Sequence, residues 1–275
     1  MDKNKLDDLI NEYKPTYFAH LGSQSSVKKS SKFKQLTEES NFLNSKNIIE
    51  SLEEYSRDTI LFFPSSATIY EGYQNKTVNE NTDALPKTNY AISKYKTQKL
   101  IGSKKDLQLN TGIMFSHESE YRRPNFFSKR VSEFLGSYYF KRIGCLKIGD
   151  ISIERDIGYA KEYVDAIFEI MIQNNNKEYI VSSNRLYRLK EIIDNTLDLL
   201  DVSYEILNEE DMLSYVDLKT ENKFIVSDKS EFREYDLRGI KGDNSIIKNE
   251  LNWVPKLNLN EICEKMIKYE LKKNR

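Results

Sequence analysis

A tyrosine and a lysine four positions apart, Tyr90 and Lys94, follow a pair of serines, Ser65 and Ser66, that ends a predicted strand. Residues four apart lie on one face of a helix, so we expect the Lys94 ammonium to lie under the Tyr90 phenol. There it would favour the phenolate and lower the tyrosine pKa from about 10 toward neutrality. A serine hydroxyl could then hydrogen-bond a substrate oxygen. Together the side chains predict proton transfer to or from an alcohol or carbonyl group.

The spacing of this pair is not specific by itself, because the chain contains 18 tyrosines and is rich in lysine. Most such pairs are contacts on exposed helix surfaces. The same spacing recurs at three other places: Tyr95/Lys99, Tyr215/Lys219 and Tyr269/Lys273. The pair at Tyr90 differs in its context, because a predicted strand, the two serines and a polar loop precede it. That context favours the catalytic interpretation.

The elements that must position these residues alternate between helices and strands. The first predicted strands cover 17–21, 59–63 and 107–115, and helices are predicted at 5–13, at 36–55 and from residue 90. This order predicts an α/β fold with a parallel sheet, whose carboxyl edge is where ligands bind. We also predict a loop at 27–34, a strand at 146–148, a turn at 155–156, a helix at 160–173, a strand at 179–181 and helices at 186–200 and 245–272.

Two polar residues have both a functional and a structural interpretation. His117 follows the predicted strand 107–115, where it could contact a ligand or be a satisfied structural histidine. Asn41 lies inside the predicted helix 36–55, where it could reach toward the catalytic group or simply be exposed. The sequence leaves both choices open.

Four cations lie close together in the sequence and could bind an anion. Arg122, Arg123, Lys129 and Arg130 fall within nine positions, together with Asn125. In a chain of net charge -1, such a cluster suggests a phosphate partner, because guanidinium groups match phosphate oxygens. A solvated surface face is the alternative.

Composition sets the broad class of the protein. The 275 residues, 39% of them hydrophobic, fit one large domain or two interleaved ones. The near-zero net charge gives no attraction to nucleic acid or anionic lipid. Cys145 and Cys263 have no metal-binding or disulfide spacing, which suggests two reduced thiols and no metal. The polar start and the absence of a long apolar run predict a soluble, cytoplasmic protein.

Several longer segments resemble the GDP-mannose 4,6-dehydratase family, in the extended branch of the short-chain dehydrogenase/reductases. The segments are LGSQSS at 21–26, SSATIYEG at 65–72, Tyr90-x-x-x-Lys94, FSHES at 115–119, RRPNFFSKR at 122–130, IERDIGYAKEYVDAIF at 153–168 and LNWVPK at 251–256. The resemblance implies an incomplete Rossmann-like, doubly wound sheet in residues 1–118, which would bind NAD(P). It also implies an interleaved, smaller nucleotide-sugar-binding domain in 119–275, with a strand near 178–182 returning to the sheet.

The resemblance implies a reaction and a role for individual residues. The family uses NADP to remove hydride from C4 of the mannose of GDP-mannose, eliminates water across C5 and C6, and returns the hydride to C6. By position, Tyr90 would be the base, Lys94 its partner and Ser66 the active hydroxyl. The cofactor-contacting positions would be Leu21, Gly22, Ser23, Gln24, Ser25, Lys94, His117 and Arg122, and the substrate-binding positions Asn125, Arg130, Arg155 and Arg233.

One departure from the family pattern concerns the elimination step. The family has a glutamate at the position of Thr68, where it works on the C5 proton and the departing C6 hydroxyl. A threonine cannot act as a carboxylate base, and loss of such a group costs about 100- to 10,000-fold in rate. Glu71 is the nearby carboxylate that could replace it.

A second departure concerns cofactor binding. The family begins with a strand, a glycine-rich turn, a helix and two more strands before the segment corresponding to Lys5. No G-x-G-x-x-G or G-x-x-G-x-x-G occurs in this sequence, and that turn is what binds the dinucleotide pyrophosphate. We therefore expect a truncated domain in which strand 17–21 is an exposed edge. A homo-oligomer or a complementing amino-terminal polypeptide could cover it.

Several functions remain open from the sequence. The first is a nucleotide-sugar dehydratase that is impaired or inactive as a lone chain. The second, which Thr68 favours, is a 4-keto reductase or epimerase of the same superfamily. The third is a non-catalytic remnant, and the fourth an unrelated α/β domain. The hexose, the base of the nucleotide and the choice of NAD or NADP are not determined.

Overall fold

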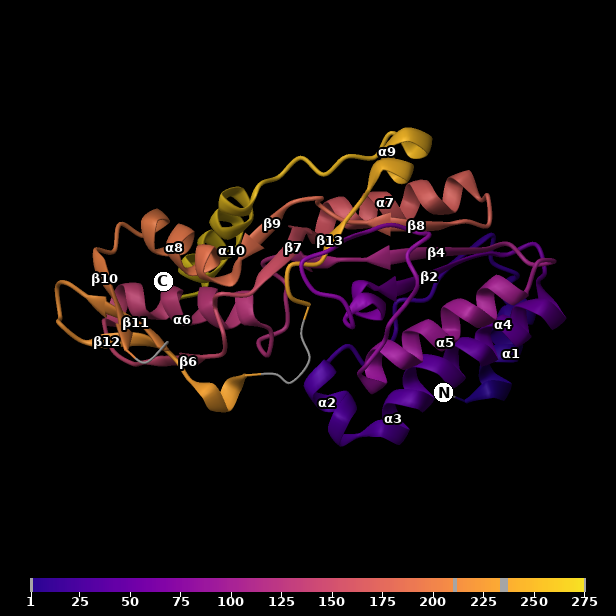
Figure 1. The fold of residues 1–275 in the computed structure, drawn as a ribbon. Helices are drawn as coiled ribbons and strands as arrows, with labels where there is room; N and C mark the ends of the chain where they lie inside the picture. Colours follow the sequence, from indigo (N-terminus) through magenta and orange to yellow (C-terminus); the bar gives the residue numbers. More distant parts are fainter. Residues whose placement is uncertain (1, 210–211, 233–236, 275) are drawn as a thin grey trace.

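Four parallel strands form the sheet that carries the predicted site (Figure 1). The computed structural model describes residues 2–209, 212–232 and 237–274. In sheet order the strands are β1 (Tyr17–Ala19), β2 (Ile60–Ser66), β4 (Leu109–Met114) and β8 (Glu178–Val181). Every neighbouring pair runs parallel, so the predicted α/β fold with a parallel sheet is confirmed.

Helices cover both faces of this sheet, as is usual for parallel sheets (Figure 1). One face carries α1 (Lys3–Tyr13), α4 (Asn44–Tyr55) and α5 (Asn89–Ser103), and the other carries α7 (Ala160–Gln173) and α9 (Ser245–Leu251). Side chains alternate along β2 because successive residues of a strand point to opposite faces. Leu61 and Phe63 therefore pack with α1 and α4, whereas Phe62 packs with α7.

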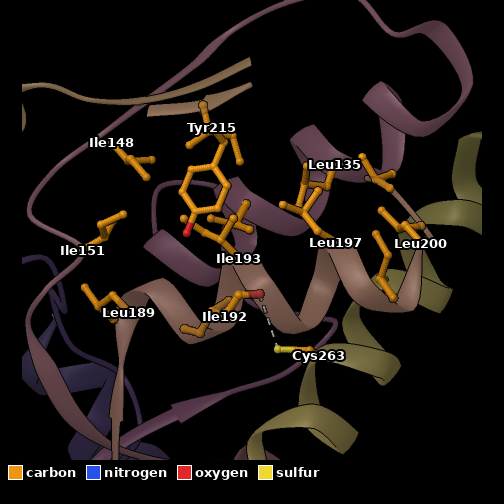
Figure 2. Close-up of a cluster of buried hydrophobic side chains, with 14 of the residues drawn as sticks. Leu135, Ile148, Ile151, Leu189, Ile192, Ile193, Leu197, Leu200, Tyr215 and Cys263 are labelled. Atoms are coloured by element: carbon orange, nitrogen blue, oxygen red, sulfur yellow. Dashed lines mark hydrogen bonds between the residues drawn. The ribbon is translucent and has the colours of Figure 1, made fainter. Parts of the chain in front are cut away.

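The carboxyl-terminal half contains a second core between a mixed sheet and three helices (Figure 2). Its elements are β6 (Leu146–Ile148), β10 (Tyr204–Glu209), β11 (Met212–Asp217), β12 (Lys223–Ser227), α6 (Phe127–Lys141), α8 (Leu189–Leu199) and α10 (Leu259–Asn274). The Cys263 thiol lies in this core and donates to the Ile192 carbonyl at 3.8 Å (Figure 2). Burial raises the pKa of this thiol to about 12, so it is an unreactive packing residue.

Short strands connect the two cores. β5 (Ser116–Glu118) pairs with β7 (Glu154–Tyr159), which pairs with β9 (Leu186–Arg188). β13 (Lys241–Gly242) pairs with β3 (Thr77–Val78). Because β5 follows directly after β4, these strands extend the structure beyond the carboxyl edge of the parallel sheet.

Asp156 on β7 holds three of these segments together. Its buried carboxylate accepts hydrogen bonds from the Ser183 amide at 2.8 Å, the Ser183 hydroxyl at 2.7 Å and the Gly242 amide at 3.1 Å. Burial outweighs these bonds and raises the pKa of Asp156 to about 6. The carboxylate therefore joins β7 to the segments after β8 and at β13.

We expect Asp156→Ala to lower the free energy of unfolding by at least about 2 kcal/mol. The substitution removes the acceptor of the Ser183 and Gly242 amides, and each such buried group costs about 1–3 kcal/mol, whereas the Ser183 hydroxyl can still donate to the Arg185 carbonyl at 3.2 Å. Urea unfolding measures the effect. Asp165→Ala, at an exposed position of α7, is the control and should change stability by less than about 0.5 kcal/mol. Equal stabilities of the two variants would contradict the bracing role.

Three predictions of local structure are wrong. Residues 27–32 form the helix α2 (Val27–Lys32), because the Ser26 hydroxyl accepts from the Lys29 amide at 3.2 Å and caps it. The predicted turn at 155–156 lies inside β7, where β9 pairs with it. The predicted helix 186–200 begins as β9 and becomes helical only at Leu189.

Two long predicted helices are interrupted. The segment 245–272 forms α9 and α10, because Asn252 adopts a φ of 54° and Pro255 follows it. The segment 36–55 lies within α3 (Lys34–Glu38), a π-helical turn (Glu39–Leu43) and α4. Such π-helical turns are frequent at functional sites.

The strand β1 lies at one end of the sheet order. Among the described residues only β2 pairs with it, and the Tyr17 side chain is 50% exposed. This matches the expected exposed edge at 17–21. Within the described ranges, every helix is too short or too polar to span a bilayer.

Candidate active site

The carboxyl ends of β2 and β4 and the start of α5 open onto a cavity of about 390 Å³. Side chains of α6, α7 and β7 form other parts of its wall. The cavity is lined by these predicted site residues: Leu21, Ser23, Ser25, Ser66, Thr68, Tyr90, Lys94, His117, Arg122 and Arg155. Residues far apart in the sequence meet here because parallel strands end at the same edge of a sheet.

The Ser66 hydroxyl is hydrogen-bonded to the side chain of Tyr90. Thr88 starts α5 just before this tyrosine, since its hydroxyl accepts from the Ala91 amide at 3.2 Å. The Ser66 oxygen accepts from the Thr68 amide at 3.3 Å and from the Thr68 hydroxyl at 3.0 Å. These two bonds leave the Ser66 hydrogen free to be donated toward Tyr90.

The expected effect of Lys94 on the Tyr90 pKa is wrong. Burial raises the pKa of Tyr90, and the opposing influences are the Ser66 hydrogen bond and the charge of Arg122. The Lys94 Nζ lies 6.0 Å from the centroid of the Tyr90 ring. The amine donates a hydrogen bond of 2.8 Å to the Pro64 carbonyl.

Lys94 is only 3% exposed, and burial lowers its pKa to about 7. Its Nζ lies 4.9 Å from the centroid of the Phe63 ring, so it has an apolar neighbour as well as the Pro64 carbonyl. Removal from water disfavours the charged form of a lysine. The amine is therefore poised to gain or lose a proton near neutral pH.

We expect this buried amine to make stability depend on pH. Between about pH 7 and the ordinary lysine value of 10.5, only the unfolded chain holds the Lys94 proton. The free energy of unfolding should therefore rise with pH by up to about 1.4 kcal/mol per unit in that window. Lys94→Met should remove this slope, and urea unfolding between pH 7 and pH 10 measures it. Lys99→Met, at an exposed position of the same helix, should retain it.

Glu71 lines the cavity, but its carboxylate is engaged by the start of α5. It accepts hydrogen bonds from the Lys87 amide at 2.6 Å, from the Thr88 amide and, at 3.3 Å, from the Thr88 hydroxyl. Thr68 lies on the same cavity wall with its hydroxyl on Ser66. The arrangement therefore gives Glu71 a structural task and leaves the position of Thr68 without a carboxylate.

His117 lines the cavity as a neutral imidazole. Its Nδ1 lies 2.8 Å from the Phe115 carbonyl. A carbonyl only accepts, so Nδ1 carries the proton and Nε2 does not. Burial, followed by the charge of Arg122, lowers the pKa of His117 and keeps it neutral. Its ring centroid lies 5.1 Å from that of Tyr163, which fixes the imidazole in the wall.

The predicted cluster of four cations does not form one phosphate site. Arg122 lines the cavity, where its Nε lies 3.3 Å from Glu118. Lys129 is buried and paired with Glu270 of α10. Arg130 instead donates to the Lys147 carbonyl at 2.6 Å. Only Lys129 and Arg130 lie on α6, where adjacent residues point in different directions, and Arg122 lies in the loop before this helix.

Other predicted ligand contacts lie outside the cavity. Asn125 and Gly22 are exposed and do not line it. The Gln24 side-chain amide donates to the Ser26 carbonyl at 3.0 Å and to the Thr37 hydroxyl of α3 at 3.2 Å. Arg233 lies outside the described residues.

Asn41 is neither exposed nor directed at Tyr90. It is buried in the π-helical turn, where its Oδ1 accepts a hydrogen bond of 2.8 Å from the backbone amide of Gln24. Its Nδ2 donates to the Gln24 carbonyl at 3.0 Å and to Ser93 at 3.2 Å. Asn41 therefore ties the loop after β1 to the helix that carries Tyr90.

Sequence analysis missed His20, which directly follows β1. Its Nε2 lies 3.1 Å from the Ser45 hydroxyl. Burial and the nearby charge of Lys94 lower the pKa of His20 to about 4, so the ring is neutral. The signal was present, because His20 lies near the end of the predicted strand 17–21.

The residues of the cavity fit the reactive end of a nicotinamide dinucleotide. Ser66, Tyr90 and Lys94 offer hydroxyl and amine donors, and Ser23 and Ser25 add small polar groups beside them. The 275 residues contain no glycine-rich dinucleotide pattern. Among the described residues, no group of three histidine, cysteine or acidic side chains could hold a metal ion.

Comparison with known proteins gives a consistent result. The model of the family described as GDP-mannose 4,6 dehydratase matches residues 1–266. The GDP-mannose 4,6 dehydratase of Cricetulus griseus is 24% identical over 278 residues, which cover 98% of this chain and 74% of that protein. The GDP-mannose 4,6-dehydratase of Vibrio cholerae is 23% identical over 286 residues, which cover 98% and 77%.

Solved structures share the fold. RMD from Pseudomonas aeruginosa, complexed with NADPH, superposes with a TM-score of 0.82 at 18% identity, covering 99% of this chain and 85% of that one. UDP-glucose 4-epimerase from Thermotoga maritima, with UDP-glucose, gives 0.81 at 18% identity, covering 100% and 83%. At these identities the likeness concerns the fold, which is Rossmann-like.

Proposed function

Because the chain belongs to the GDP-mannose 4,6-dehydratase family, we propose that it acts on a nucleotide sugar and retains only part of the family's reaction. The retained part is proton transfer at a sugar hydroxyl or ketone by Tyr90, assisted by Ser66 and Lys94. The lost part is the elimination of water. The proposal rests on one observation. These three side chains line one cavity, and Thr68 lies in its wall at the position where the family has a glutamate.

The proposed proton transfer follows from the state of the side chains. The raised pKa of Tyr90 keeps the phenol protonated at neutral pH, so it can give its proton to a carbonyl oxygen. When substrate binds, the Ser66 hydroxyl would turn its hydrogen from Tyr90 to that oxygen. To work in the oxidative direction, Tyr90 must first lose its proton, which a cation bound nearby would favour.

A nicotinamide dinucleotide, when bound, would supply the hydride acceptor or donor that the redox step needs. Lys94, Ser23, Ser25 and His117 are the residues that would hold its reactive end. The diphosphate of the nucleotide sugar would find a guanidinium group at Arg155 on the cavity wall, and Arg122 on the same wall would contact the cofactor. By family, the proposed substrate is GDP-mannose and the cofactor NADP.

A second candidate is reduction of a 4-keto nucleotide sugar, or epimerisation through such a ketone. Thr68 and the protonated state of Tyr90 favour it, because reduction of a ketone needs a proton donor and does not need a carboxylate base. Both candidates share the same cavity and differ in which chemical step is completed.

The purified chain, given GDP-mannose and NADP, tests the proposal. We expect little or no 4-keto-6-deoxy product. We expect reduced nicotinamide to appear in an amount comparable to the enzyme, because oxidation can proceed without elimination. A 4-keto nucleotide sugar with NADPH should be reduced if the second candidate holds. Full conversion to the 4-keto-6-deoxy product would contradict the loss of elimination, and no reaction with any of these mixtures would contradict both candidates.

A further inference from the structure

Gln98 connects the active-site strand to a carboxylate that the proposed reaction does not use. It follows Tyr90 and Lys94 on α5 at intervals of four residues, so the three lie on one side of the helix. Its Oε1 accepts a hydrogen bond of 2.6 Å from the Ser65 hydroxyl, and its Nε2 donates one of 2.6 Å to Glu178. Ser65 is 2% and Gln98 7% exposed, so the Ser65 bond is shielded from water.

The carboxylate determines which way the Gln98 amide points. An ionised glutamate only accepts hydrogen bonds, so the nitrogen of Gln98 must face Glu178 and its oxygen must face Ser65. The Ser65 hydroxyl is then obliged to donate toward α5. This leaves Ser66 as the member of the serine pair whose hydroxyl serves Tyr90.

The two hydrogen bonds also span the sheet. Ser65 lies on β2 and Glu178 on β8, with β4 between them. Gln98 therefore connects α5 to both β2 and β8. The neighbours of Ser65 make the catalytic contacts, because the Pro64 carbonyl accepts from Lys94 and Ser66 bonds to Tyr90. A shift of β2 against α5 would change both contacts together.

We infer that Gln98 is a positioning residue of this site: oriented by Glu178, it fixes the end of β2 against α5 through Ser65. Its importance for turnover rests on the proposed function. Its effect on the surroundings of Lys94 does not, so the two can be tested separately.

The experiment exchanges the two polar groups. Gln98→Glu places two carboxylates side by side, whereas the double variant Gln98→Glu/Glu178→Gln again provides one carboxylate and one amide. Competitive acylation with acetic anhydride, measured by mass spectrometry, gives the extent of labelling of Lys94 relative to that of the exposed Lys99, which we call the Lys94 labelling ratio. We expect the Lys94 labelling ratio to rise about tenfold in Gln98→Glu and to return to within about threefold of wild type in the double variant, as for residues coupled in one hydrogen-bond network.

A matched exchange serves as the control. Gln35 and Glu39 form an exposed pair joined at 2.9 Å, and exchanging them should leave the labelling of Lys94 unchanged. If Gln98→Glu does not fold, Gln98→Met replaces it and should show the same rise in Lys94 labelling. Adding Glu178→Gln to Gln98→Met should not reverse that rise, because methionine cannot form either hydrogen bond.

The outcomes separate this inference from the proposed function. Unchanged Lys94 labelling in the folded single variant, or a double variant that does not restore it, overturns the positioning role. Restored labelling together with restored rates of the redox step supports both. Restored labelling with no reaction in any variant, wild type included, overturns the proposed function and supports the positioning role.

Discussion

Replacing Tyr90 by phenylalanine is expected to slow the redox step on the nucleotide sugar by about 100- to 10,000-fold, the usual cost of removing a general acid or base. The Tyr90 phenol lines the cavity and is hydrogen-bonded to Ser66. Phenylalanine keeps the ring and its packing, so stability and ligand affinity should change little. Single-turnover measurement of the reduced nicotinamide, in either direction, gives the rate.

Tyr95→Phe is the matched control for this prediction. Tyr95 lies on the same helix and also precedes a lysine by four residues, Lys99, but it does not line the cavity. Its substitution should leave the redox rate within about twofold of wild type, as is usual for a site outside the chemistry. Comparable losses in the two variants would show that Tyr90 acts through folding and not through its proton.

Replacing Thr68 by glutamate is expected to raise formation of the 4-keto-6-deoxy product by about 100-fold or more, the contribution of a positioned carboxylate base. The Thr68 side chain already lines the cavity, and its hydroxyl lies 3.0 Å from the Ser66 oxygen. A longer carboxylate at this position would extend from the same wall toward the sugar. Product formation from GDP-mannose, followed by mass spectrometry, measures the gain.

Thr68→Gln separates the carboxylate from the size of the side chain. It has nearly the same volume as Thr68→Glu but no basic group, so it should give no gain. An equal gain in both would mean that shape alone limits elimination. A wild-type chain that already eliminates water efficiently would direct attention to Glu71, whose Glu71→Gln substitution should then abolish the activity.

Much of the site was predictable because its signals are local. The helix that begins near Tyr90 follows from the cap at Thr88 and from the spacing to Lys94, and Ser66 follows a strand of apolar residues. The exposed position of β1 was also expected. Errors arose at short strands such as β7 and β9, whose pairing depends on partners distant in the sequence.

The charged groups were the least predictable part. Lys129 was expected to bind phosphate, yet it is buried against Glu270, which lies 141 positions away. Lys94 was expected to lower the pKa of Tyr90, yet its amine is held by the Pro64 carbonyl, 30 positions away. No local pattern reveals which partner a long, flexible cation will reach.

The sequence by itself determined the alternating helices and strands of the parallel sheet, the family likeness and the serine, tyrosine and lysine proposed for the site, because periodicity, capping and motif spacing act over a few residues. Only the tertiary structure decided which side chains share the cavity, which cations are neutralised elsewhere and how burial shifts the pKa values of Tyr90 and Lys94. The reason is physical: desolvation and hydrogen-bond partners are set by atoms brought together from distant parts of the chain.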